Sequence, residues 1–336
     1  MASYSVILSG FAFGTARNDS ERKRFPKSTR HYKSGAKRPS TDYRQLNFRQ
    51  LTMNYVILDL EWNTAYSPQA HRFVNEIIEF GAVKVDAELN EIGEFERLIS
   101  PRIGRKKLTG RVKQLTRLTN EDLAGQDDFA TVTRDFTDFL GDAVLMTWGT
   151  SDIHTLIENY EYNGSSRVIP FLSRYCDLQE YCERAIDRYD EGNQIGLGRF
   201  AELIGVDFSE EEQHRAAADA YLSLKCLKSV IPGYPLESCI LRADCDEFYD
   251  RLLFKNHYLT SLSDPDVDRG MLKFNCDVCG RQLRRVKQWR LHNRSFTADF
   301  YCKACDRRFT GKVAFKKLYD DVKVTRKLTV KEKTEQ

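Results

Sequence analysis

The segment Leu58-Asp-Leu-Glu-Trp62 places two carboxylates, Asp59 and Glu61, at the end of an apolar run that begins at Tyr55. Side chains alternate along a strand, so Asp59 and Glu61 point to the same face of the predicted strand. Two buried carboxylates are costly unless a cation compensates them, and a divalent cation does so with oxygen ligands. The pair indicates a metal site, although a strand end that meets solvent explains an isolated pair more often.

Two later segments supply residues that complete such a site. Asp152 follows an apolar strand and a glycine turn, and it lies at the start of a predicted helix. Ligands collect at this place in α/β sheets. An acid there also interacts favourably with the helix dipole, which is the alternative explanation. In His214-Arg-Ala-Ala-Ala-Asp219 the polar ends lie about 140° apart around a helix, so we place His214 on the preceding loop and Asp219 inside the helix. The small alanines allow that helix to approach the sheet and bring Asp219 near Asp59. The alternative is an exposed histidine beside an alanine-rich core helix.

Four of the nine cysteines form two Cys-x-x-Cys pairs, separated by 22 residues. Paired motifs of this kind supply four thiolates to a tetrahedral Zn²⁺ ion that has a structural role, because no position is left open for substrate. The predicted ligands of one structural Zn²⁺ are Cys276, Cys279, Cys302 and Cys305, in a zinc ribbon; free thiols are the alternative. The five scattered cysteines do not indicate a disulfide framework.

The elements around these residues alternate between strands and helices. The apolar patterns predict strands at Tyr55–Leu60, Ile77–Val85, Phe95–Ile99 and Ala143–Trp148. Helical spacing predicts helices at Phe129–Leu140, Ser151–Tyr160, Leu197–Ile204 and Arg215–Val230, with Ser151 as a cap and a further helix start signalled by Thr119 and Asp122. This order is typical of an α/β sheet with helices on its faces.

Taken in chain order, the three acidic segments resemble the DEDDh family of 3′–5′ exonucleases. LDLEW is similar to the first motif of that family, WGTSD to the second and HRAAADA to the third, and the resemblance covers residues 54–232. Leu108-Thr109-Gly110 and Gly196-Leu197-Gly198 also match its spacers. The exoribonuclease branch looks most similar, including RNase T, the histone-mRNA 3′ exonucleases and bacterial sporulation-kinase-pathway inhibitors. The resemblance implies an RNase H-like fold, a mixed five-stranded sheet with flanking helices.

The resemblance also implies a role for each catalytic residue. Asp59, Glu61, Asp152 and Asp219 would hold two Mg²⁺ or Mn²⁺ ions, with Asp59 between them. His214 would act as general base on the attacking water, since the ordinary pKa of histidine lies near neutral pH. The expected reaction is hydrolysis of phosphodiester bonds from the 3′ end, with release of nucleoside monophosphates and a preference for single-stranded RNA. The alternatives are a DNA proofreading-type exonuclease and a non-catalytic nucleic-acid-binding regulator.

The charge is segregated along the chain, which indicates a polyanionic partner. Residues 1–52 carry 11 Lys/Arg and 3 Asp/Glu, residues 53–268 carry 22 and 39, and residues 269–336 carry 19 and 7. Basic residues with interspersed aromatics suit a nucleic-acid strand, although solvated faces are the plainer explanation. The residues expected to contact nucleic acid are Trp62, Arg105, Lys106, Lys107, Arg284, Arg285, Lys287 and Arg290. Trp62 would stack on a base, or else pack in the core.

The predicted organisation has five parts. Residues 1–52 form a basic, disordered arm, or else translation begins at Met53 and these residues are not made; residues 53–232 form the exonuclease domain, 233–268 a helical connector, 269–320 the zinc ribbon and 321–336 a basic tail. The sequence contains neither a clear leader peptide nor an apolar run that would span a membrane, so we expect a cytoplasmic protein. No protein partner is predicted.

Overall fold

The computed structural model describes residues 53–103, 107–164, 166–190, 193–209, 214–231 and 234–331. The predicted arm at residues 1–52, the predicted contacts Arg105 and Lys106, and residues 332–336 lie outside the described residues.

Strand β1 (Tyr55–Ser67) lies in the middle of the first sheet and has two apolar faces. Val56, Leu58 and Leu60 belong to one buried cluster, whereas Tyr55 and Ile57 belong to another. This division follows from the alternation of side chains along a strand. The residues Tyr55–Leu60 are therefore mostly apolar because both faces of the strand are covered.

The first sheet is mixed and has the strand order β3-β2-β1-β4-β5-β6. Strands β1, β2 (Arg72–Val85) and β3 (Glu91–Leu98) are antiparallel, and β4 (Val144–Thr147) and β5 (Arg174–Asp177) continue the sheet parallel to β1. The sixth strand is β6 (Leu241–Arg242), antiparallel to β5. The RNase H-like mixed sheet is thus confirmed, with six strands instead of five because part of the predicted connector adds β6 at its edge.

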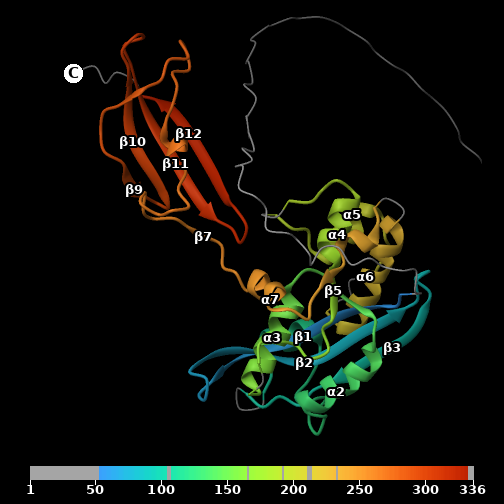
Figure 1. Cartoon of the computed structure of the whole chain (residues 1–336). Coiled ribbons are helices and arrows are strands. Elements are labelled where there is room, and N and C mark those ends of the chain that lie inside the picture. Colours follow the sequence, from blue (N-terminus) through green and yellow to red (C-terminus); the bar gives the residue numbers. More distant parts are fainter. Residues whose placement is uncertain are drawn as a thin grey trace, which may run out of the picture. The chain divides into compact units, whose positions relative to one another are not determined.

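Helices cover both faces of this sheet (Figure 1). The cluster that contains Val56 also holds side chains from α2 (Phe129–Leu140), α3 (Ser151–Tyr162) and α7 (Asp246–Leu252). The cluster that contains Ile57 holds side chains from α4 (Leu178–Ala185), α5 (Leu197–Ile204) and α6 (Ala216–Val230). A further short helix, α1 (Gly110–Thr116), is capped by Thr109, whose hydroxyl accepts a hydrogen bond from the Val112 N–H. Asp59 and Glu61 share their strand parity with Ile57 and therefore face the α6 side.

Two local predictions were wrong. Thr119 and Asp122 do exchange hydrogen bonds, since the Thr119 N–H donates to Asp122 Oδ2 (2.7 Å) and the Asp122 N–H donates to Thr119 Oγ1 (3.2 Å). No helix follows, because the chain turns away at Gly125, which has a φ of 78°. Ser151 is the first residue of α3 rather than its cap; Thr150 precedes the helix and makes no capping hydrogen bond through its side chain.

Residues 257–331, here called the C-terminal module, form a second sheet with their own core. Its strands are β7 (His257–Tyr258), β8 (Arg284–Arg285), β9 (Arg290–His292), β10 (Ser295–Cys302), β11 (Arg307–Lys317) and β12 (Val322–Val330). Two 3₁₀ turns, η4 (Leu236–Cys239) and η5 (Arg269–Leu272), lie in the connecting residues and the module. The basic tail predicted from residue 321 is, through Val330, a strand paired with β11, because Val322, Val324 and Leu328 pack against the module's core.

None of the helices in the described residues is both long enough and apolar enough to cross a bilayer.

Candidate active site and cysteine cluster

The first two predicted ligands lie side by side on β1, next to the only register shift between β1 and β2. Asp59 pairs with Gly81 and Glu61 with Glu79 across the strands, and the shift follows between Glu61 and Trp62. Both acids are partly buried, and the strand around them is apolar. Bulges of this kind re-aim side chains next to sites in many sheets.

Asp152 reaches the same place from α3. Because β4 runs parallel to β1, the helix that follows β4 begins beyond the end of β1 that carries the two acids. The Leu60 N–H donates a hydrogen bond to Asp152 Oδ1 (3.0 Å), and Asp152 is only 4% exposed. The backbone between Asp59 and Glu61 therefore holds the third carboxylate directly.

Helix α6 supplies Asp219, and it approaches the sheet at Gly81. A methyl group at Gly81 would lie 2.0 Å from the backbone nitrogen of Ala217, so only glycine fits under the helix. His214 precedes the helix with a φ of 68°, and its N–H donates to Asp219 Oδ2 (3.2 Å). Ligand atoms of Glu61, His214 and Asp219 all lie within 4.8 Å of one another.

Burial, with repulsion between neighbouring acids at three of them, raises the pKa values of the four carboxylates. Burial, followed by the charges of Asp152 and Asp219, raises the pKa of Asp59 well above its ordinary range. Burial, followed by the charge of Glu79, raises the pKa of Glu61 to about 8. Burial also raises the pKa of Asp152 to about 7, against the hydrogen bond from the Leu60 N–H, and it raises the pKa of Asp219. Raised values of this kind identify negative charge that lacks compensation.

A second ionic cluster, which the sequence did not predict, adjoins the four carboxylates and consists of Arg215, Glu79 and Glu96. Arg215 Nε donates to both oxygens of Glu79 (2.9 and 3.2 Å), and its Nη2 donates to Glu96 (2.9 Å). The Glu79 side chain is fully buried on β2. Because Arg215 directly follows His214, this pairing fixes the backbone that presents the histidine. A glutamate inside the apolar run Ile77–Val85 was the signal that could have revealed it.

A buried asparagine joins the loop before α1 to β1. Asn63 is fully buried; its Oδ1 accepts from the Thr109 N–H (2.9 Å), and its Nδ2 donates to the Lys107 carbonyl (3.2 Å). This contact places Lys107, one of the expected nucleic-acid contacts, beside β1, and its side chain is exposed. Trp62 is partly buried and packs against the core cluster of Val56, which agrees with the packing alternative.

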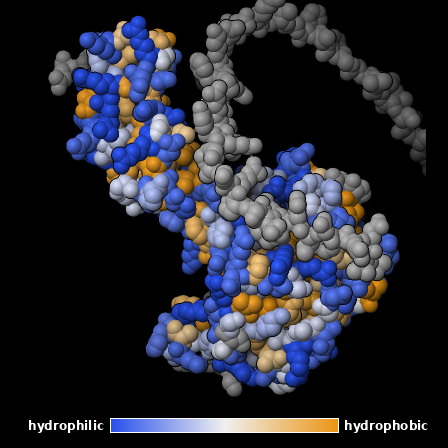
Figure 2. Space-filling view, in the orientation of Figure 1, coloured by the Kyte–Doolittle hydropathy of each residue, from blue (hydrophilic) through white to orange (hydrophobic). Residues whose placement is uncertain are grey.

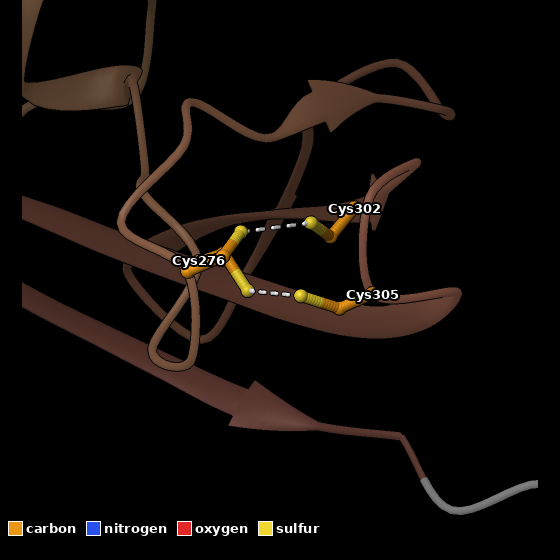
Figure 3. Close-up of side chains that lie close together, drawn as sticks. Cys276, Cys302 and Cys305 are labelled. Carbon is orange, nitrogen blue, oxygen red and sulfur yellow. Dashed lines mark hydrogen bonds between the residues drawn. The ribbon is translucent and has the colours of Figure 1, made fainter.

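The cysteines of the C-terminal module form one cluster (Figure 3). All four Sγ atoms lie within 4.8 Å of one another. The Cys276–Cys305 and Cys279–Cys302 sulfur distances are 3.9 and 3.6 Å, close to the edge of about 3.8 Å in a tetrahedron with Zn–S bonds of about 2.3 Å. Hydrogen bonding to the neighbouring thiols, first Cys279, raises the pKa of Cys305 to about 12, so a bound cation is what would favour the thiolates. The cluster fits a zinc module.

The four predicted contacts in the C-terminal module differ in their surroundings. All of Arg284, Arg285, Lys287 and Arg290 are exposed. Arg284 and Arg285 are the two residues of β8 and pair with Tyr301 and Phe300 of β10. Lys287 forms a salt bridge with Asp299 (3.1 Å). The predicted nucleic-acid contacts are therefore not equivalent.

Comparison with known proteins gives related sequences and folds. DNA polymerase III PolC-type of Staphylococcus saprophyticus is 30% identical over 185 residues, which are 53% of this chain and 12% of that protein. The same polymerase of Latilactobacillus sakei is 32% identical over 193 residues, which are 54% of this chain and 12% of that protein. The chain thus spans only a small part of these relatives' length.

Among solved structures, the nuclease domain of 3′hExo bound to rAMP is 19% identical, covering 57% of this chain and 96% of that chain, with a TM-score of 0.47. E. coli exonuclease I with a dT13 oligonucleotide is 16% identical, covering 54% and 42%, with a TM-score of 0.41. A family described as a zinc finger of C2H2 type matches residues 300–317, which include two of the clustered cysteines. The family described as exonuclease matches residues 56–227, just over half of the 336 residues. The chain therefore belongs to the exonuclease family.

Proposed function

We propose that this protein is a two-metal 3′–5′ exonuclease that removes single nucleotides, as nucleoside monophosphates, from the 3′ end of a single strand, with RNA preferred. The observation that carries the proposal is the meeting of Asp59, Glu61, Asp152 and Asp219 beside His214. A protein that only binds nucleic acid has no need of this combination.

The carboxylate cluster suits divalent cations. Its donors are all oxygen atoms, which favours Mg²⁺ or Mn²⁺ over softer metals. Apart from Arg215, which is paired with Glu79 and Glu96, no described arginine or lysine forms a salt bridge at the cluster. We assign Asp59, Glu61, Asp152 and Asp219 as the residues that would hold the ions. When bound, two such ions stabilise the charge that develops on the phosphate and on the leaving oxygen.

His214 is the residue that this chain offers for proton transfer. Its side chain is exposed, its ring lies within 4.8 Å of Glu61 and Asp219, and its backbone is fixed through Asp219 and through the neighbouring Arg215. A ring held in this way accepts the proton of the attacking water as the phosphodiester bond breaks. The four carboxylates would serve as ligands of the ions, which leaves the imidazole as the base.

The proposed preference for RNA rests on the exposed arginines of the C-terminal module, with aromatic residues interspersed among them in the sequence. DNA is the second candidate substrate, and the relatives favour it, because the polymerases that match over about half of this chain act on DNA by name. The two substrates differ at each sugar only by the 2′-hydroxyl, so they can be compared directly.

The test is digestion of RNA and DNA strands of one sequence, labelled at the 5′ end, in the presence of Mg²⁺. We expect a ladder that shortens from the 3′ end and is absent with Asp59→Asn, which keeps the shape of the side chain and removes its charge. Immediate release of the labelled nucleotide would show the opposite direction. No degradation of either strand with Mg²⁺ or Mn²⁺ would leave the non-catalytic binding protein as the function.

A further inference from the structure

The C-terminal module contains a hollow whose lining includes Arg285, one of the expected nucleic-acid contacts. It has a volume of about 350 Å³ and is lined by residues of η5, β8 and β10 and by Trp289. Its floor is aromatic and aliphatic, with Phe300 and Leu283 3% and 5% exposed. Volumes of about 300–1,000 Å³ are typical of small-ligand sites.

The aromatic floor is fixed in place. Trp289 meets Phe300 edge to face with ring centroids 5.6 Å apart, and Phe300 meets Phe274 in the same manner at 5.2 Å. Gly311 of β11 makes room for these rings, since a methyl group there would lie 2.6 Å from the Phe300 ring. Trp289 remains only partly buried, so part of its indole is open to the hollow. A rigid, partly open indole is a platform on which a flat ring can stack.

The rim of the hollow is cationic. Arg269, Lys273 and Arg285 line it, no acidic residue does, and all three side chains are exposed. None of the three forms a salt bridge within the described residues, whereas the nearby Lys287 is paired with Asp299. The nearest acid in sequence, Asp268, accepts a hydrogen bond from the Gly270 N–H (2.7 Å). In Figure 2, hydrophilic residues cover much of the visible face of the module, with hydrophobic residues between them.

We propose that this hollow binds one nucleotide of an unpaired strand, with the base on Trp289 and the phosphate among Arg269, Lys273 and Arg285. The inference rests on the proposed function for the identity of the strand, but it assigns a second binding site on the C-terminal module. Aromatic platforms with surrounding cations bind single strands with little preference for sequence, because every base has a flat face and every nucleotide a phosphate.

Two arginines of the C-terminal module provide a matched pair of variants. Arg285 lines the hollow, whereas Arg308 of β11 does not. Both are exposed, so Arg285→Gln and Arg308→Gln remove the same charge without affecting the core.

The experiment measures the anisotropy of a fluorescent single-stranded oligonucleotide bound to the full chain with Asp59→Asn and without added Mg²⁺. This prevents hydrolysis without a chelator, which would also remove zinc from the cysteine cluster. Arg285→Gln in this background is expected to weaken binding and to lower the slope of log Kd against log salt by about 0.7, the value for one phosphate contact on a single strand. Arg308→Gln should leave both unchanged. Equal effects of the two variants, or none from Arg285→Gln, would overturn the assignment.

A photo-crosslink locates the base. An oligonucleotide with 5-iodouracil at its centre, irradiated on the protein, should attach to the peptide that contains Trp289, and Arg285→Gln should reduce that product. Attachment elsewhere in the module alone would refute the base position. Free adenosine monophosphate should displace the strand poorly; displacement as effective as that by unlabelled strand would show that the ligand is a free nucleotide.

These results can be separated from the proposed function. Turnover of labelled strands in Mg²⁺ reports on Asp59 and its neighbours, and binding to the Asp59→Asn chain without Mg²⁺ reports on the hollow. A chain that binds through Arg285 but cuts nothing would refute the exonuclease proposal and keep this one. A chain that degrades strands normally, but whose binding does not depend on Arg285, would refute this proposal and keep the exonuclease proposal.

Discussion

Gly81 is the position at which the active site should be most sensitive to a change that touches no catalytic side chain. In the structure, a methyl group at this position would lie 2.0 Å from the Ala217 nitrogen and 2.1 Å from the Ala216 carbonyl carbon. Ordinary contact begins at about 3.4 Å, so Gly81→Ala requires the first turn of α6 to retreat by about 1.4 Å. The obstructing atoms are backbone, and rotation of a side chain therefore cannot relieve the clash.

The retreat would carry Asp219 and His214 away from the two acids of β1. Misplacement of a catalytic group by about 1 Å costs on the order of 10²-fold in rate, so we expect Gly81→Ala to lower kcat by about that factor. Overpacking of a core costs about 1–3 kcal/mol of unfolding free energy, so the melting temperature should fall as well.

The assay is the initial rate on a 5′-labelled strand at saturating Mg²⁺, together with circular dichroism and a thermal melt. Gly110→Ala is the control, because a methyl group there meets no heavy atom within 4 Å. A folded Gly81→Ala protein with the wild-type rate would refute the reasoning, since it would show that α6 can move without loss of the site.

Other predictions test the remaining parts. His214→Ala should lower kcat by about 10²–10⁴-fold with little change in substrate binding, as measured by single-turnover rates and Kd; retained activity across pH would exclude the general-base role. Arg215→Ala should lower kcat more than it raises KM, because its ion pair holds the backbone beside the histidine; an effect confined to KM would contradict this. Without added Mg²⁺ or Mn²⁺, the folded-state pKa values of Glu61 (about 8) and Asp152 (about 7) lie above their ordinary values, so the folded state binds more protons. The unfolding free energy should therefore fall as pH rises from about 5 to about 8, and Mg²⁺ should restore it at the higher pH; a melting temperature that rises with pH without Mg²⁺ would refute the sign. Cys302→Ser should lower the bound zinc measured by mass spectrometry and lower the stability of the C-terminal module; unchanged metal content would remove that residue from the ligand set.

The parts of the fold that were predictable are those in which local pattern and tertiary contact agree. Helices α2 and α5 have the predicted limits, because their apolar stripes are the buried faces. Asp59 and Glu61 share a face because a strand alternates, whatever surrounds it. The approach of α6 was expected from its alanines, but its partner Gly81 lies on another strand and could be identified only from the structure.

The parts that were not predictable depend on long-range pairing. Strand β6 has two residues, and its position next to β5 follows from the antiparallel pairing of Leu241 with Tyr175, not from any local pattern. The Arg215–Glu79 pair joins residues that are distant in sequence. The high charge of Val322–Val330 resembled a tail, because only one side of the strand contacts the core. The roles of the site residues and the limits of the domains stay predictions.

Strand β12 also bears on the solubility of the protein. It forms one edge of the second sheet, so its outer backbone groups are open to a strand from another molecule. Lys323, Arg326 and Lys327 lie along this edge and are exposed or partly exposed. A second copy that docked there in an antiparallel arrangement would bring like charges together, which disfavours edge-to-edge association. The charges that made this segment resemble a basic tail thus act, in the folded protein, against its aggregation.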